Sequence, residues 1–161
     1  MKNFINFILE LFNTKNYTWI QKGEQNIAKF DLIETYYIHL DSIGIDAYNL
    51  YFYCIDMNKN KIFNLINNTN KTSFKVLSNV KNSVEDFMKN NKVDFIGYSS
   101  HEKERIPLYM LMLQNLCREN DTYSFKKKGN KTYYFLYDKN IRMDADLYIK
   151  RFMENDDKLK K

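Results

Sequence analysis

The sequence predicts an α+β fold in which one mixed β-sheet is flanked by helices. Two observations support this prediction. In the first half of the chain, apolar and polar side chains alternate over long stretches, which is typical of half-buried strands. In the second half, a strand-like stretch at residues 93–98 is followed by a helix-like stretch from Ile106 and then by further strand-like segments. This order of strand, helix and strand requires a crossover connection, with helices packed on the sheet.

Size, composition and charge limit the classes of protein that the sequence can encode. The length of 161 residues predicts a single domain over residues 1–161, and the hydrophobic fraction of 44% argues against disorder. The 25 basic and 20 acidic residues give a net charge of +5, which permits weak attraction to nucleic acid. Cys54 and Cys117 lie in apolar stretches without a C-x-x-C pair, so no zinc cluster or disulfide framework is expected. No run approaches the roughly 18 apolar residues of a membrane span.

The first half of the predicted fold is a helix followed by three antiparallel strands. Apolar side chains recur at helical spacing near the N-terminus and then at a spacing of two. Gly44 and the polar residues 58–60 mark the turns between the strands. The predicted elements are a helix at 2–13, within an N-terminal segment of residues 1–13, and strands at 27–40, 47–57 and 61–66.

The second half completes a sheet core that spans residues 27–137. Polar residues 67–73 end in good helix N-cap residues, and Pro107 suits the first turn of a helix, where its missing N–H has no cost. Residues 128–130 form the turn of a hairpin. The predicted elements are helices at 74–91 and from 106, strands at 93–98, 122–127 and 131–137, and a C-terminal helix with a charged tail at 142–161.

The most chemically varied stretch of the chain lies between the 93–98 strand and the next helix. Arg105 and Tyr109 are four residues apart and share a helix face, so Arg105 is a candidate anion or carboxylate ligand beside Tyr109. The loop that contains Lys71 follows another strand and is expected at the same edge of the sheet. The predicted partner-binding residues are Ser99, His101, Arg105, Tyr109 and Lys71.

Each of these residues also has a purely structural interpretation. Arg105 could pin the strand–helix turn while Tyr109 packs in the core, His101 could be a solvated turn residue, and Ser99 with Glu102 fits a helix capping box. No set of nucleophile, base and acid can be assembled, and no metal-ligand spacing occurs. The sequence therefore predicts no catalytic residue, no metal site and no cofactor.

A lysine-rich hairpin offers a second kind of binding surface. The basic side chains could neutralise phosphates, and the neighbouring rings of Tyr123, Phe125, Tyr133 and Tyr134 could stack on bases. Lysines on a hairpin also protect sheet edges from aggregation, which is the alternative interpretation. The candidate nucleic-acid-binding residues are Lys126, Lys127, Lys128 and Lys131.

The order of elements resembles the core of the GNAT family of N-acetyltransferases. In that family, three antiparallel strands lead to a helix whose N-terminus holds the coenzyme A pyrophosphate. The resemblance aligns residues 67–73 with the pyrophosphate loop and Leu108-Tyr109 with a Leu-Tyr pair whose tyrosine protonates the leaving thiolate. The family's Q/R-x-x-G-x-G/A signature is absent, because no glycine lies between Gly44 and Gly97, so we expect no binding of coenzyme A.

The chain also resembles small bacteriophage proteins of unassigned role. The resemblance comprises Tyr51-Phe52-Tyr53, a V-x-x-x-V helix at Val76 and Val80, Phe95, and an R-x-x-L-Y motif. The motif reads Arg105-Ile106-Pro107-Leu108-Tyr109 in this chain. The abundance of Asn and Lys fits an AT-rich genome, and together these features imply a phage origin.

These observations lead to one expected function and two alternatives. We expect a non-catalytic phage accessory or virion-associated protein that binds another protein, in the cytoplasm of the infected bacterial host or in the virion. The 16% of aromatic residues would suit such an adhesive surface. The alternatives are a divergent GNAT-type acyltransferase and a weak nucleic-acid-binding protein that uses the lysine-rich hairpin.

Overall fold

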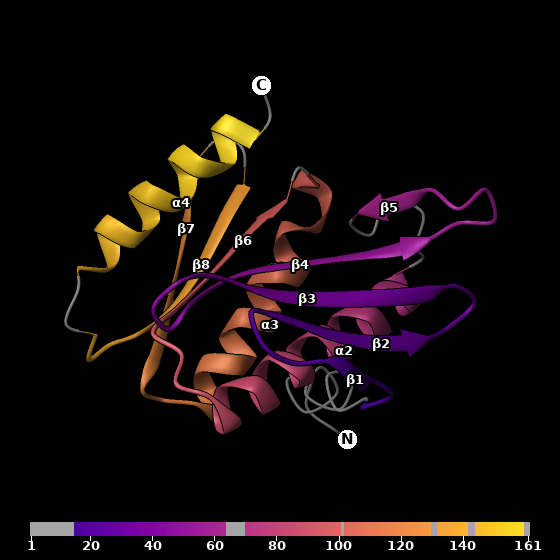
Figure 1. Cartoon of the computed structure of the whole chain (residues 1–161), viewed down its shortest axis with the longest axis horizontal. Helices are drawn as coiled ribbons and strands as arrows, with labels where there is room; N and C mark the ends of the chain where they lie inside the picture. The colour runs from indigo at the N-terminus through magenta and orange to yellow at the C-terminus, as the bar shows by residue number, and fades with distance from the viewer. Residues whose placement is uncertain (1–14, 64–69, 101, 130–131, 142–143, 160–161) are drawn as a thin grey trace, which may run out of the picture.

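A computed structural model describes residues 15–63, 70–100, 102–129, 132–141 and 144–159 (Figure 1). The helix predicted at 2–13 lies outside these residues. The strands are β1 (Thr18–Gln21), β2 (Gln25–Asp31), β3 (Thr35–Gly44), β4 (Ala47–Ile55), β5 (Lys61–Phe63), β6 (Phe95–Ser100), β7 (Tyr123–Lys128) and β8 (Thr132–Asp138). The helices are α2 (Asn70–Asn90), the short 3₁₀ turn η1 (Lys103–Arg105), α3 (Ile106–Glu119) and α4 (Ala145–Leu159).

The eight strands form one mixed sheet, so the predicted α+β class is confirmed. Seven of them follow the order β1-β2-β3-β4-β6-β8-β7, and β5 pairs with β4 off this path. The β4–β6 pair is parallel and joins Ala47–Asn49 to Phe95–Gly97, whereas the other pairs are antiparallel. The predicted strand at 93–98 is confirmed as β6, and the predicted hairpin at 122–137 as β7 and β8.

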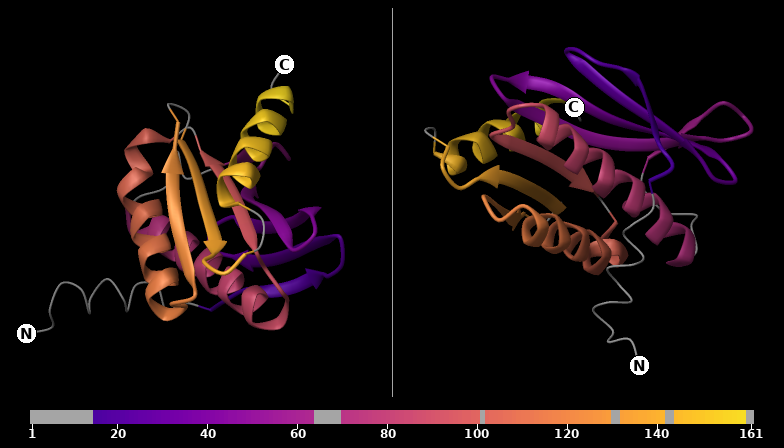
Figure 2. Two further views of the ribbon diagram at one scale, coloured as in Figure 1. Left: turned by 90° about the vertical axis from the view of Figure 1, so that its left-hand side faces the viewer. Right: turned by 90° about the horizontal axis from the view of Figure 1, so that it is seen from below.

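Helices cover the two faces of this sheet unequally. Helices α2 and α3 pack against each other on one face, where they bury apolar side chains from β2, β3, β4, β6 and β8. Helix α4 lies on the opposite face over β6 and β8 (Figure 2). In the part of the chain that the structure describes, no helix covers that second face on β2 and β3. We call this surface of β2, β3 and β4 the open face.

Two local predictions are wrong. Residues 27–40 are not one long strand, because the chain reverses after Asp31 and β2 pairs antiparallel with β3. The turn contains neither Gly nor Pro; Thr35 Oγ1 donates to Asp31 Oδ1 at 2.7 Å, and Ile33 at its tip is 98% exposed. The other lies at residues 14–26, where no element is predicted; part of this stretch forms β1, and Trp19 packs there on Phe87 of α2 with ring centroids 6.1 Å apart.

A close approach of α4 to the sheet depends on Gly97. This residue lies in the middle of β6, and a Cβ added there would overlap the ring of Phe152 on α4. Phe152 in turn contacts the rings of Phe95 and Phe135, with centroids 6.3 and 5.5 Å away. The second, smaller core of the protein therefore requires a residue without a side chain at position 97.

Gly97→Ala should lower the free energy of unfolding by about 1–3 kcal/mol, the usual cost of overpacking a core. The matched control is Gly44→Ala, because a Cβ at Gly44 would meet only the Ala47 Cβ at an ordinary 3.9 Å. Urea unfolding of both variants measures the difference. If Gly97→Ala proved as stable as Gly44→Ala, α4 would not pack on β6 as described.

Candidate functional site

The predicted partner-binding stretch forms a buried corner at the end of β6. Ser99 is half-buried and pairs with Tyr133 of β8, whereas Ser100 is buried and its Oγ accepts a hydrogen bond from the Glu102 amide at 3.1 Å. The predicted capping box of Ser99 and Glu102 is therefore wrong. The reason is that Ser100, and not Ser99, lies within reach of that amide.

Arg105 faces a buried carboxylate in this corner. Its Nε lies 3.8 Å from Glu102 Oε2, and the side chain of Glu102 is only 5% exposed. The Tyr109 hydroxyl donates to Glu102 Oε1 at 3.4 Å, and Tyr109 itself is fully buried. Burial raises the pKa of Tyr109 and that of Tyr98, whose ring centroid lies 5.3 Å from that of Tyr109. This geometry favours the interpretation of Arg105 as a residue that pins the turn.

Two of the predicted partner-binding side chains cannot be placed. His101 and the side chain of Lys71 lie outside the described residues. Their roles, like those of Ser99 and Arg105, stay predictions. Tyr109 is in the core, so a partner could not reach its ring in this conformation.

The lysine-rich hairpin is partly neutralised by α4. Lys126 Nζ and Lys128 Nζ lie 3.3 and 3.6 Å from Asp146 Oδ1, and Lys126 also lies 5.5 Å from the ring centroid of Tyr137. Tyr133 and Tyr134, predicted to stack on bases, are each only 2% exposed. Lys127 is exposed, and Lys131 lies outside the described residues. Nucleic-acid binding here stays a prediction, with fewer free charges and rings than the sequence suggests.

The open face carries a series of linked hydrogen bonds among residues that are not predicted site residues. Tyr51 donates to Asp41 Oδ2 at 2.8 Å, and its hydroxyl lies 2.9 Å from His39 Nδ1. On the other side of the ring, His39 Nε2 lies 3.1 Å from the Tyr53 hydroxyl. Because the single Tyr51 proton goes to Asp41, its oxygen accepts from His39 Nδ1–H, and His39 Nε2 accepts from Tyr53. This arrangement fixes one tautomer of a neutral imidazole.

Burial favours the neutral forms of His39, Tyr51 and Tyr53. It lowers the pKa of His39, an effect that Asp41 opposes and the nearby charge of Lys61 reinforces. It also raises the pKa values of Tyr51 and Tyr53, with further contributions from Asp41. At neutral pH the open face therefore presents uncharged aromatic residues. The sequence did give one signal, since alternation places His39 and Asp41 on the polar side of their strand.

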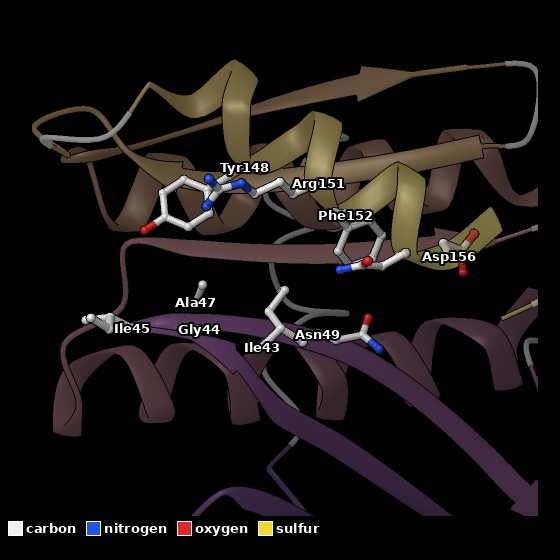
Figure 3. Close-up of a pocket in the computed structure, with 10 residues that line it drawn as sticks. Ile43, Gly44, Ile45, Ala47, Asn49, Tyr148, Arg151, Phe152 and Asp156 are labelled. Atoms are coloured by element: carbon white, nitrogen blue, oxygen red, sulfur yellow. The ribbon is translucent and has the colours of Figure 1, made fainter. Parts of the chain in front are cut away.

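A separate cavity of about 340 Å³ lies between the β3–β4 turn and α4 (Figure 3). Its apolar wall includes Ile43, Ala47 and Phe152, and side chains from both elements point into the space between them. Polar groups come from Asn49 on β4 and Arg151 on α4. Neither residue is among the predicted site residues, because nothing in the sequence indicates that positions 49 and 151 are neighbours.

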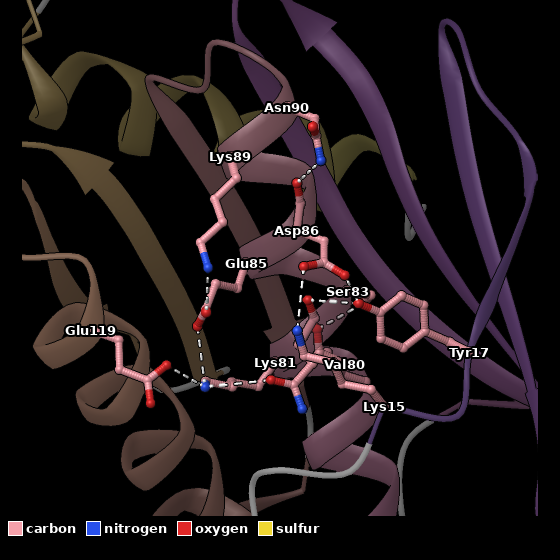
Figure 4. A network of polar contacts seen from close by, with 11 residues as sticks. Lys15, Tyr17, Val80, Lys81, Ser83, Glu85, Asp86, Lys89, Asn90 and Glu119 are labelled. Carbon is pink, nitrogen blue, oxygen red and sulfur yellow. Dashed lines mark hydrogen bonds and ion pairs between the residues drawn. The ribbon is translucent and has the colours of Figure 1, made fainter.

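A buried ionic network joins α2 to α3 on the far side of the molecule (Figure 4). Lys81, whose side chain is 2% exposed, lies 3.1 Å from Glu85 Oε2 and 2.6 Å from Glu119 Oε2. Burial alone would raise the pKa of Glu85, but the hydrogen bonds and positive charges of Lys89 and Lys81 outweigh it and lower the pKa to about 2. Stability from this carboxylate is complete above its ordinary pKa of 4.5 and is lost as the pH falls toward 2. Each charged group of the network has an ion-pair partner of opposite sign, so the network holds α2 and α3 together.

Neither a metal-binding cluster nor a membrane-spanning helix is found among the described residues. No group of three or more His, Cys, Asp and Glu side chains in them is arranged to hold a metal ion. None of their helices has the length and apolar character needed to cross a membrane.

Lys81→Met should lower the free energy of unfolding by about 3 kcal/mol, because it leaves the buried Glu85 carboxylate without its partner on the same helix and removes the ion pair to Glu119 on α3. The control is Lys89→Met, which removes a 3.1 Å contact to the same carboxylate from a side chain that is 60% exposed. That change should cost at most about 1 kcal/mol. Chemical denaturation at neutral pH measures both values, and equal losses would contradict the central position of Lys81.

Comparison with known proteins identifies the family of this chain. The model of a protein family of unknown function (DUF6934) matches residues 10–151. No curated protein and no solved structure matches the sequence. The matched residues include every described strand and nearly all of the helical structure, from β1 to the middle of α4. The chain therefore belongs to the DUF6934 family, whose function is unknown.

Proposed function

We propose that the protein is a non-catalytic binding protein that holds another protein against its open face. The observation that carries this proposal is the uncovered aromatic surface of β2, β3 and β4. Tyr37 and Tyr51 are half-buried there, and their rings stack on Tyr53 and His39 with centroids 5.5 and 4.5 Å apart. Tyrosine is enriched in protein interfaces because it offers a large rigid ring and a polar tip.

The hydrogen bonds within the open face pre-organise this surface for binding. The Tyr51 and Tyr53 hydroxyls are tied to Asp41 and His39, so their rings keep one orientation before a partner arrives. A rigid surface loses less conformational entropy on binding. Lys29 lies half-buried beside Tyr37 in the register, and Lys61 Nζ lies 4.7 Å from the Tyr53 ring centroid. The two lysines favour a partner with acidic groups around an apolar or aromatic centre.

The setting that we propose is a bacteriophage infection. The resemblance to small phage proteins, through Tyr51-Phe52-Tyr53 and the R-x-x-L-Y motif, and the Asn- and Lys-rich composition support it. The partner would then be a protein of the host or the virion, met in the cytoplasm of the infected bacterium or in the particle.

Several observations support a non-catalytic role. Tyr109, the tyrosine that the GNAT resemblance would make the proton donor, is buried and hydrogen-bonded to Glu102. Its raised pKa makes it a poor acid at neutral pH. His39 is only 7% exposed, and both its ring nitrogens are engaged by tyrosines. The polar groups of Tyr109 and His39 therefore have partners within the protein.

A GNAT-type acyltransferase remains the second candidate because of one topological observation. The strands β4 and β6 are parallel and α2 lies between them in the chain, in keeping with the order of elements on which that resemblance rests. Against it, the glycine signature is absent from residues 67–73. Of residues 67–73, which that resemblance aligns with the pyrophosphate loop, residues 70–73 form the first turn of α2, and residues 67–69 lie outside the described residues.

Substitutions on the open face should abolish capture of the partner. Tyr37→Ala removes an interface ring and Lys29→Glu reverses a flanking charge; each should weaken binding by tenfold or more, as for an interface hot spot. The control is Tyr137→Ala, a partly buried tyrosine on the half of the sheet that α4 covers. Tagged proteins are compared by affinity capture from infected-cell lysate and quantitative mass spectrometry. A partner retained equally by all variants would exclude the open face as its binding surface.

Coenzyme A and acetyl-coenzyme A should leave the melting temperature unchanged, because the loop lacks glycines that would let backbone N–H groups approach a pyrophosphate. Differential scanning fluorimetry with millimolar cofactor measures this directly. A saturable rise of several degrees would instead favour the acyltransferase and exclude the non-catalytic proposal.

A further inference from the structure

We infer that the cavity between the β3–β4 turn and α4 is a binding site for a small molecule that consists of an apolar body and one carboxylate. The site uses residues other than those of the open face, and the inference does not depend on the proposed protein-binding function. Its volume of about 340 Å³ lies at the lower end of the roughly 300–1,000 Å³ typical of ligand pockets.

The apolar part of the ligand is defined by the walls of the cavity. Ala47 and Phe152 are buried at 1% and 7% exposure and belong to the second core. Ile43 lines the cavity from the turn although 49% of its surface is exposed, and Tyr148 lines it from α4 (Figure 3). An apolar body placed here would remove the exposed part of Ile43 from water, which favours binding in proportion to the area buried.

The charge of the ligand follows from Arg151. Its guanidinium is exposed at the cavity and has neither an ion pair nor a hydrogen bond within the described part of the chain. The half-buried amide of Asn49 likewise lacks a side-chain hydrogen bond among the described residues, and it can supply a further donor. A guanidinium matches a carboxylate through two parallel hydrogen bonds, so an anionic carboxylate is the complementary group.

The single acidic residue of the cavity fixes where the carboxylate lies. Asp156 accepts a hydrogen bond from the buried Tyr133 hydroxyl at 2.8 Å, which holds its negative charge beside β8. In Figure 3 the Asp156 carboxylate and the Arg151 guanidinium lie at opposite ends of the cavity. An anion is therefore attracted to the Arg151 end of the cavity and repelled from the Asp156 end. The charges of the cavity thus favour a ligand with one carboxylate over a ligand with two.

The test uses 3-phenylpropionate as the probe and its neutral amide, 3-phenylpropionamide, as the matched ligand. Binding to the full chain is followed by chemical-shift titration of ¹⁵N-labelled protein. We expect saturable shifts at residues around Asn49 and Arg151, and about tenfold weaker binding of the amide, which lacks the charge that a guanidinium recognises. Arg151→Gln should lower the affinity for the carboxylate about tenfold and leave that for the amide unchanged.

Arg118→Gln is the control, because Arg118 is an exposed arginine on α3 that does not line the cavity. It should bind both probes as the unmodified protein does, and Ile43→Ala should weaken both probes to a similar extent. Equal binding of the carboxylate and the amide would overturn the inference, as would equal losses in the Arg151 and Arg118 variants. The absence of saturable shifts at millimolar 3-phenylpropionate would also overturn it. Unchanged backbone ¹H–¹⁵N signals of residues away from the cavity verify that the variants are folded.

Discussion

The parallel ladder between β4 and β6 holds the two halves of the sheet together. It joins Ala47–Asn49 to Phe95–Gly97, and beyond it β4 turns to β5 while β6 continues beside β8. The antiparallel strands β1 to β5 form one half, and β6, β8 and β7 form the other. The core beneath α2 and α3 extends across both halves, so those helices reinforce a junction that three residue pairs alone would hold weakly.

The two surfaces of interest both result from this division. Helix α4 packs over β6 and β8 because Gly97 lets Phe152 approach the sheet, and it reaches β4 only near Ala47. The rest of the outer surface of β2, β3 and β4 is left without a helix in the described structure, which produces the open face. Beside the contact of α4 with β6, the β3–β4 turn faces α4 across a cavity. The open face and the cavity thus both result from the fact that α4 covers only one half of this face of the sheet.

Much of the architecture could be predicted from the sequence, because spacing determines which side chains an element buries. The change of period after residue 98 identified β6 and α3, and Val76, Val80 and Val84 marked the buried side of α2. The turn after Asp31 was missed because apolar alternation continues through it, and a polar side-chain hydrogen bond replaces the usual glycine. Buried Lys81 was missed because one of its two carboxylate partners, Glu119, lies on α3, far from Lys81 along the chain.

The candidate sites were less predictable than the fold for a physical reason. His39 and Tyr51 meet only through the register of two strands, and Asn49 meets Arg151 only after α4 returns to the sheet. Spacing along the chain carries no information on such contacts. By contrast, Arg105 and Glu102 are close in sequence, and their pairing was within reach of the structural interpretation of that turn.

The short parallel ladder also has a consequence for how the chain folds. The hairpins β2–β3, β3–β4 and β7–β8 close over short loops, whereas the β4–β6 ladder pairs residues separated by the whole of β5 and α2. Long loops are entropically costly to close, and few hydrogen bonds reward this closure. We expect the hairpins to form first and the docking of the two halves to set the rate. Until then, the edges of β4 and β6 that later pair are available to another copy of the chain, so slow docking would favour domain-swapped association during synthesis.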